Sequence, residues 1–169
     1  MSNIILIGFM GVGKGTIARA YAKKFDEFAI DTDDLIESLE NKKIKTIFSE
    51  DGEPYFRALE KKCALWLEKS VQNSIISTGG GFYRQENLKR IGKVVLLDSS
   101  FDGIYKRLKN HPNSEKKFAK RPLFQNLDEA RELYMIRSSE YKKVADIVLD
   151  VEDKSIEKII KELRNAIKK

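Results

Sequence analysis

The chain is poor in the residues on which several protein classes depend. Its 169 residues include one cysteine, Cys63, and one histidine, His111. A single cysteine cannot form a disulfide within the chain, and such sparing use is typical of a reducing cytoplasm. A lone histidine in a polar segment argues against a histidine-based catalytic triad, and the cysteine and histidine spacing of a zinc site is absent.

Long apolar segments are also absent. No apolar run approaches the ~18 residues that a membrane-spanning helix needs. The first run, at 4–7, is short and leads directly into a glycine-rich segment, so we expect no signal peptide. Hydrophobic residues nevertheless make up 41% of the chain, which is enough for a core. We therefore expect one α/β domain over residues 1–169, in the cytoplasm and without a membrane partner.

Positive charge is in excess, and it leaves two interpretations open. The chain carries 32 basic and 26 acidic residues, a net charge of +6. Nucleic-acid binding is one interpretation, but no aromatic RNA-binding motif accompanies the charge. Lysines instead stand beside glutamates, as at 60–62 and 157–161, which is typical of solvated helix surfaces. We favour that interpretation, with a smaller share of the charge attracting anionic substrates.

A glycine-rich motif follows the first apolar run. Residues 8–16 read Gly-Phe-Met-Gly-Val-Gly-Lys-Gly-Thr, between a predicted strand at 3–8 and a predicted helix at 14–25. Glycines let successive backbone N–H groups face one anion, and the helix N-terminus adds its positive dipole end. Lys14 supplies a charge for the outer phosphates, so the motif predicts an ATP site rather than a flexible turn. Its predicted ATP contacts are Gly11, Val12, Gly13, Lys14, Gly15 and Thr16.

Strands and helices alternate along the rest of the chain. The further predicted strands lie at 28–30, 74–78, 93–98 and 147–151. The further predicted helices lie at 35–39, 44–49, from Pro54 onward, and at 101–109, 127–144 and 156–167. This alternation predicts a mostly parallel sheet between two layers of helices. In the helix after Pro54, one apolar face is expected to comprise Phe56, Leu59, Cys63, Trp66 and Leu67, and the polar segment 111–122 is expected to be a mobile loop.

Three predicted strands end in residues suited to chemistry, and ligands bind at the carboxyl ends of such strands. The first ends in the phosphate loop, the second in Asp31 and Asp33, and the third in Gly79, Gly80 and Gly81. Asp31 suits Mg²⁺, directly or through water, and Asp33 suits an acceptor hydroxyl as positioner or base. The alternative is that an aspartate caps the next helix, for which Asp34 is the better candidate. The glycines allow close approach of a ligand, or form a loose turn.

Arginines near these segments are weaker candidates. Arg57 and Glu60 are three residues apart, on the helix face opposite Phe56 and Cys63, and there they could form an ordinary surface ion pair. Near an acceptor, Arg57 could instead clamp a carboxylate with two hydrogen bonds. Arg121 ends the basic segment, where closure would bring its charge to a triphosphate. Spacing alone assigns no role to Arg137.

Taken together, these motifs resemble the shikimate kinases of the nucleoside-monophosphate-kinase-like P-loop family. The resemblance covers essentially the whole chain and rests, in order, on residues 8–14, 31–37, 47–60, 77–81, 120–123 and 137–141. It implies a three-layer α/β/α P-loop kinase fold with a central five-stranded parallel sheet. It also implies a substrate-binding subdomain at about 34–60 and a lid at about 111–120.

The resemblance further implies an activity. A shikimate kinase uses ATP to phosphorylate the 3-hydroxyl of shikimate, in the chorismate pathway to aromatic amino acids, with Mg²⁺ as cofactor. The implied catalytic residues are Lys14 on the ATP phosphates, Asp33 on the shikimate hydroxyls and Arg121 on the transferring phosphate. The other implied contacts are Asp31 for the metal, Arg57, Arg137, Gly79, Gly80 and Gly81 for shikimate, and Arg107 and Lys154 for the adenine side. The implied protein is a monomer without a nucleic-acid partner.

One departure keeps alternatives open. Gly15 stands where the family normally has a serine or threonine that ligates Mg²⁺, and Lys-Gly-Thr is the adenylate kinase form of the loop. We expect more water ligands on the metal and a larger role for Asp31 in placing it. A nucleoside monophosphate kinase is one alternative, although Asp33 would then face the acceptor's negative charge. A non-enzymatic ATP- or nucleic-acid-binding module, supported only by the basic charge, is the other.

Overall fold

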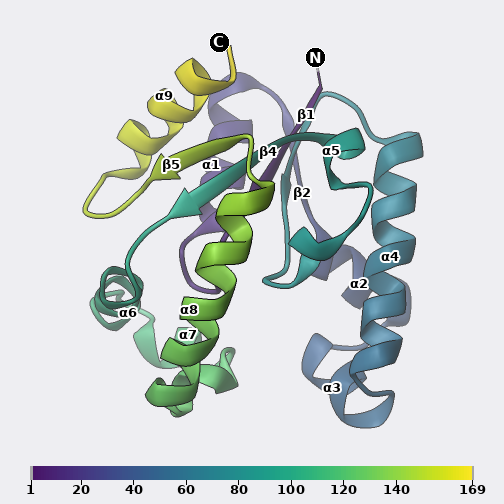
Figure 1. Cartoon of the computed structure of the whole chain (residues 1–169), viewed down its shortest axis with the longest axis vertical. Helices are drawn as coiled ribbons and strands as arrows, with labels where there is room; N and C mark the ends of the chain where they lie inside the picture. The colour runs from purple at the N-terminus through teal and green to yellow at the C-terminus, as the bar shows by residue number, and fades with distance from the viewer. Residues whose placement is uncertain (1, 169) are drawn as a thin grey trace.

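Five parallel strands form the central sheet of the computed structural model, which describes residues 2–168 (Figure 1). They are β1 (Asn3–Ile7), β2 (Phe28–Asp31), β3 (Ser74–Ser77), β4 (Gly92–Asp98) and β5 (Ile147–Asp150). Their order across the sheet is β2-β3-β1-β4-β5, and every neighbouring pair is parallel. The strand predictions and the sheet type are confirmed, and β1 with its phosphate loop occupies the centre.

Helices cover the sheet on both faces, as expected. They are α1 (Lys14–Phe25), α2 (Thr32–Glu40), α3 (Ile44–Glu50), α4 (Glu53–Ser70), α5 (Leu88–Ile91), α6 (Phe101–Lys109), α7 (Ser114–Ala119), α8 (Leu127–Val144) and α9 (Ile156–Ile167). Two 3-10 turns lie at Phe82–Arg84 and Pro122–Gln125. Helix α1 lies behind the sheet in Figure 1 and packs against α9, and α8 lies in front of the sheet. Helices α2 and α3 pack against α4. Within residues 2–168, no helix combines the length and apolarity needed to cross a membrane.

The core explains why the central strands are almost purely apolar. Every side chain of β1 is buried, and so are those of β4 from Val94 to Leu97. Parallel strands covered on both faces have no solvent side, so they read as continuous apolar runs rather than alternating ones.

Asn3 is the polar exception in β1, and its amide joins three segments. Its Nδ2 donates to the carbonyl oxygens of Val71, at 2.8 Å, and Ile91, at 2.9 Å. Its Oδ1 accepts from the backbone N–H of Ser74 at 3.1 Å. A buried amide is tolerated here because its donors and its acceptor are both used.

Two expectations about packing were wrong. The segment 111–122 is not simply a loop, because it contains α7, whose Phe118 packs against Tyr105 and Phe124 with ring centroids 5.7 and 6.0 Å apart. On α4, Trp66 is 46% exposed, whereas Cys63 and Leu67 are buried in the core. The apolar face of α4 is therefore narrower than the sequence pattern suggested.

Substitution of Asn3 by alanine should destabilise the fold. It leaves buried backbone groups on three segments without partners, so we expect a loss of about 2–4 kcal/mol in the free energy of unfolding. The measurement is equilibrium urea denaturation. Asn165→Ala, at an exposed position on α9, is the control and should change the value by less than about 0.5 kcal/mol. Equal effects of the two substitutions would contradict this role for Asn3.

Candidate active site

The loop between β1 and α1 has the backbone of an anion site. Gly8, Gly11 and Gly13 adopt φ angles of 147°, 85° and 108°, which residues with a Cβ rarely adopt. Lys14 begins α1, and its Nζ donates to the carbonyl oxygens of Gly8, at 2.6 Å, and Phe9, at 3.2 Å. The ammonium group is thereby held across the loop at the helix N-terminus, where a phosphate is favoured.

Burial makes the charge of Lys14 costly. The side chain is 8% exposed. Burial lowers its pKa to about 8, against the opposing pull of Asp33 and Asp31, while Arg121 and Arg137 lower it further. A bound anion would stabilise the protonated form, because nearby negative charge favours it.

Asp31, rather than Asp34, caps the next helix. Its Oδ1 accepts from the backbone N–H groups of Asp33, at 3.0 Å, and Asp34, at 3.2 Å. A cap accepts from N–H groups two and three residues ahead, so the residue that ends β2 is the one placed to do it. The other oxygen, Oδ2, lies toward the phosphate loop, since a methyl group on Gly15 would be 3.7 Å from it.

Asp33, two residues after Asp31, has one carboxyl oxygen enclosed. Its Oδ1 is buried and has no hydrogen-bond partner among residues 2–168. Burial raises its pKa to about 7, helped by the charges of Asp31 and Glu60 and opposed by Lys14. An enclosed acceptor without a donor is costly, so the site suits a ligand hydroxyl that supplies one.

Three charged side chains converge on residues 79–81, which we call the glycine turn. A methyl group on Gly79 would lie 2.7 Å from Oδ1 of Asp33. The corresponding distance is 2.8 Å from Gly80 to Nη1 of Arg137, and 2.5 Å from Gly81 to Nη1 of Arg57. A Cβ at any of these three positions would therefore displace the end of a charged side chain. We call these three side chains and the glycine turn the acceptor pocket.

Arg57 is fixed by two glutamates. Its Nη1 donates to Glu60 at 2.6 Å and its Nη2 to Glu53 at 3.0 Å. The pairing with Glu60 is as expected, but its surface location is wrong, because Glu60 is 1% exposed. Burial raises the pKa of the Glu60 carboxyl, and the guanidinium of Arg57 opposes that rise. The pair thus orients a cation toward the glycine turn.

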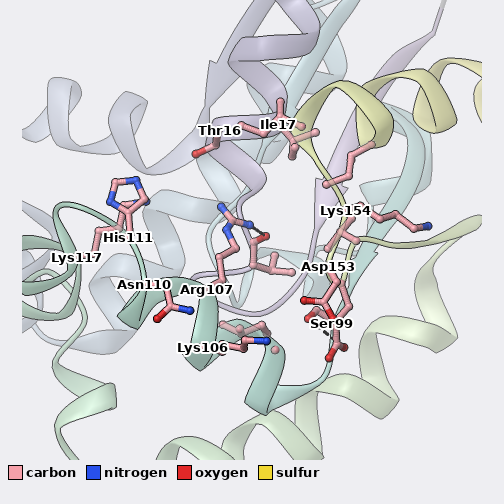
Figure 2. Close-up of a pocket in the computed structure, with 17 residues that line it drawn as sticks. Thr16, Ile17, Ser99, Lys106, Arg107, Asn110, His111, Lys117, Asp153 and Lys154 are labelled. Atoms are coloured by element: carbon pink, nitrogen blue, oxygen red, sulfur yellow. Dashed lines mark hydrogen bonds between the residues drawn. The ribbon is translucent and has the colours of Figure 1, made fainter.

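A cavity of about 310 Å³ lies on the opposite side of the phosphate loop (Figure 2). Val12, Thr16, Arg107 and Lys154 line it, which brings together predicted ATP contacts from both ends of the chain. Arg107 extends into it from α6 and donates to the carbonyl oxygen of Val12 (Figure 2). Lys154 pairs with Glu162 at 2.8 Å. Further lining residues that the sequence had not singled out for this site are Ser99, Lys106, Asn110, His111, Lys117 and Asp153.

Arg121 lies close enough to Lys14, Lys117 and Arg107 for their charges to interact. Its Nη1 donates to the carbonyl oxygen of Lys117 at 2.8 Å, which ties it to α7. Burial lowers the pKa of Arg121, and Arg107 adds to the effect. Burial also lowers the pKa of Lys117, followed by the charges of Arg107, Arg121 and Arg19. Such mutual repulsion is relieved by a multiply charged anion.

The side chains that hold the glycine turn were missed by sequence reasoning. The hydroxyl oxygen of Thr32 accepts from the backbone N–H of Gly79 at 3.2 Å. The hydroxyl of Tyr141 donates to the carbonyl oxygen of Gly80 at 2.7 Å. The one available signal was the i, i+4 spacing of Arg137 and Tyr141, which places them on one face of α8.

The sequence and fold match those of known proteins. A family model of shikimate kinase matches residues 10–168. The chain is 41% identical, over 93% of its length and 91% of the relative's, to a shikimate kinase of Helicobacter hepaticus. Among solved structures, the shikimate kinase of Bacteroides thetaiotaomicron superposes with a TM-score of 0.82 at 29% identity, covering 99% of each chain. The shikimate kinase of Acinetobacter baumannii in complex with shikimate gives 0.84 at 29% identity, covering 99% of this chain and 93% of that one. The chain therefore belongs to the shikimate kinase family.

Proposed function

We propose that this chain transfers the γ-phosphoryl group of ATP to the 3-hydroxyl of shikimate, giving shikimate 3-phosphate and ADP. The observation that carries the proposal is the convergence of Asp33, Arg57 and Arg137 on the glycine turn, beside the phosphate loop. Shikimate has one carboxylate and several hydroxyls, so two guanidinium groups and one carboxylate complement it. Arginine pairs well with a carboxylate because its donors match both oxygens.

On the acceptor side, Arg57 and Arg137 hold the shikimate carboxylate, and residues 79–81 approach the ring. Asp33 accepts a hydrogen bond from a hydroxyl of the bound shikimate. Its pKa of about 7 suits a group that positions this hydroxyl and takes its proton as the phosphoryl group arrives. The residues of about 34–60 make up the substrate-binding subdomain in this proposal.

On the donor side, the cavity of Figure 2 takes the nucleoside, with Arg107 and Lys154 on the adenine side. The N–H groups of residues 11–16 and the ammonium of Lys14 hold the phosphates. Arg121 meets the transferring phosphate, and the segment of about 111–120 closes over it as a lid. Closure excludes water, which protects ATP from hydrolysis.

Mg²⁺ fits the site with few protein ligands. Residues 2–168 contain no cluster of three or more histidine, cysteine, aspartate or glutamate side chains that could hold a metal. Asp31 still directs Oδ2 toward Gly15, and Mg²⁺ commonly keeps several waters and binds through one or two carboxylates and substrate phosphates. Asp31 would hold it, through water, and the bound ion would neutralise charge on the phosphates. We further propose a monomer that acts in the cytoplasm.

The decisive experiment is an acceptor screen. The purified chain is supplied with ATP and Mg²⁺, ADP release is followed, and shikimate is compared with AMP and other nucleoside monophosphates. We expect turnover with shikimate alone, abolished by Lys14→Met, which removes the phosphate-loop charge. Turnover of AMP without turnover of shikimate would reject the proposal in favour of a nucleoside monophosphate kinase.

Asp33→Asn should reduce the rate far more than it reduces ATP affinity. The amide keeps the shape but cannot take a proton, so kcat should fall about 10²- to 10⁴-fold. In the unsubstituted enzyme, kcat/KM for shikimate should fall as the pH drops below about 7, because Asp33 becomes protonated. Steady-state kinetics between pH 5.5 and 9, on the order of half-unit steps, would measure both. Asp34→Asn, at an exposed neighbouring position, is the control; an equal loss there would show that Asp33 has no special role.

Gly15→Ser should increase the affinity for Mg²⁺ in the presence of nucleotide. A Cβ at this position would be 3.2 Å from Nη1 of Arg19, the flexible end of a side chain, and 3.7 Å from Oδ2 of Asp31. A serine hydroxyl therefore fits beside Asp31 and supplies a further oxygen ligand. We expect the Mg²⁺ concentration for half-maximal ADP binding, followed by calorimetry, to fall about three- to tenfold. Gly15→Ala adds the carbon without the hydroxyl, and the same shift in this variant would refute the interpretation.

A further inference from the structure

Tyr141 is a buried residue of α8 that the proposed mechanism leaves without a role. It is 2% exposed. Its ring packs edge-on against Tyr83, with centroids 4.6 Å apart, and Tyr83 belongs to the 3-10 turn that follows the glycine turn. Its hydroxyl donates to the carbonyl oxygen of Gly80 at 2.7 Å. The side chain is therefore held by its ring and by its hydroxyl, both against the segment that forms the acceptor pocket.

The same hydroxyl lies beside Arg137. A methyl group on Gly80 would be 2.8 Å from Nη1 of Arg137 and 3.8 Å from the hydroxyl oxygen of Tyr141. Arg137 is one helical turn earlier on α8, and its Nε is buried without a hydrogen-bond partner among the described residues. Among residues 2–168, no glutamate forms a salt bridge with this guanidinium, whereas Glu60 and Glu53 both pair with Arg57. Its placement must come from what packs around it.

The charge state of Tyr141 suits a permanent donor. Burial raises the pKa of its hydroxyl, and the charge of Arg137 opposes that rise only in part. The hydroxyl keeps its proton at neutral pH, so it can always donate to the carbonyl oxygen of Gly80. This hydrogen bond restricts the orientation of the Gly80 peptide. A lost donor would leave that partly buried carbonyl without its partner, which is costly.

We propose that Tyr141 is a positioning residue for the acceptor, which fixes the Gly80 peptide and the guanidinium of Arg137 in the geometry that binds shikimate. The proposal rests on the proposed function, because it assigns Tyr141 to the same pocket. Tyr141 itself touches no reacting atom in this account. It acts through Gly80 and Arg137, so its removal should weaken acceptor binding and spare nucleotide binding.

The chain offers a matched control on the same helix. Tyr134 lies two turns earlier on α8, and its hydroxyl also donates to a backbone carbonyl, that of Ser99, at the same 2.7 Å. Ser99 lines the nucleotide cavity rather than the acceptor pocket. Tyr141→Phe and Tyr134→Phe therefore remove equivalent hydrogen bonds and keep both rings, but only the first touches the acceptor side.

The test compares these two variants in steady-state kinetics, in shikimate titration by calorimetry and in thermal unfolding. Tyr141→Phe should raise the KM and the dissociation constant for shikimate roughly tenfold, the effect of one lost buried hydrogen bond. Its KM for ATP should stay within about twofold, whereas Tyr134→Phe should leave the KM for shikimate within about twofold. Comparable melting temperatures of the two variants would separate positioning from stability. Unchanged shikimate binding in Tyr141→Phe, or an equal change in both variants, would overturn the proposal.

A double-mutant cycle tests the path through Arg137. Arg137→Met alone should weaken shikimate binding strongly, and adding Tyr141→Phe should cost clearly less than it does in the unsubstituted chain, because the group it orients is gone. Full additivity would contradict the assignment to Arg137. Failure of the proposed function is distinguishable from failure of this inference: in the first case the unsubstituted chain itself does not turn over shikimate, and in the second only the variants behave differently from expectation.

Discussion

The acceptor side of this protein depends on a steric constraint, the absence of any Cβ on residues 79–81. Asp33, Arg57 and Arg137 come from α2, α4 and α8, and each reaches to within 2.5–2.8 Å of the place where a Cβ would stand. A side chain at any of these positions would push one of the charged groups out of the pocket. The sheet order makes the meeting possible, because β3 lies between β2 and β1, and so its carboxyl end stands between Asp31 and the phosphate loop.

The site has two parts with unpaired polar or charged groups, the cations around the phosphate loop and the enclosed carboxyl oxygen of Asp33. Burial lowers the pKa of Lys14 to about 8 and raises that of Asp33 to about 7, so both groups are driven toward their neutral forms. Their mutual attraction limits this, since each charge favours the charged form of the other. Beyond Lys14, Arg107, Arg121 and Lys117 repel one another. In the proposed function, a triphosphate would neutralise the cations, and an acceptor hydroxyl would donate to the enclosed oxygen of Asp33.

Sequence reasoning succeeded where the signal was local. The phosphate loop, the strands and α1 follow from glycine spacing and continuous apolar runs, and α1 and α8 begin and end where the pattern placed them. It failed where packing decides. The cap at Asp31, the burial of Glu60 and the exposure of Trp66 depend on which neighbours α2 and α4 meet. The helix in the polar segment after His111 depends on the packing of Phe118 against aromatic rings from α6 and from the turn at 122–125. Tyr141 could be placed on the face of Arg137, but only the fold shows that Gly80 lies opposite.

The site can do without a hydroxyl at Gly15 because Asp31 and Arg19 supply a carboxyl oxygen and a positive charge beside it. Oδ1 of Asp31 is committed to capping α2, which leaves one oxygen on the side of the loop. A Mg²⁺ ion bound there, as we propose, would depend mainly on phosphate and water oxygens, a shell that suits it because it sheds water reluctantly. The guanidinium of Arg19 stands 3.2 Å from where a Cβ on Gly15 would lie, so positive charge is present at this point of the loop even before a metal arrives. The missing hydroxyl therefore removes a ligand without leaving the phosphates unopposed, and its loss should weaken metal placement more than it weakens nucleotide binding.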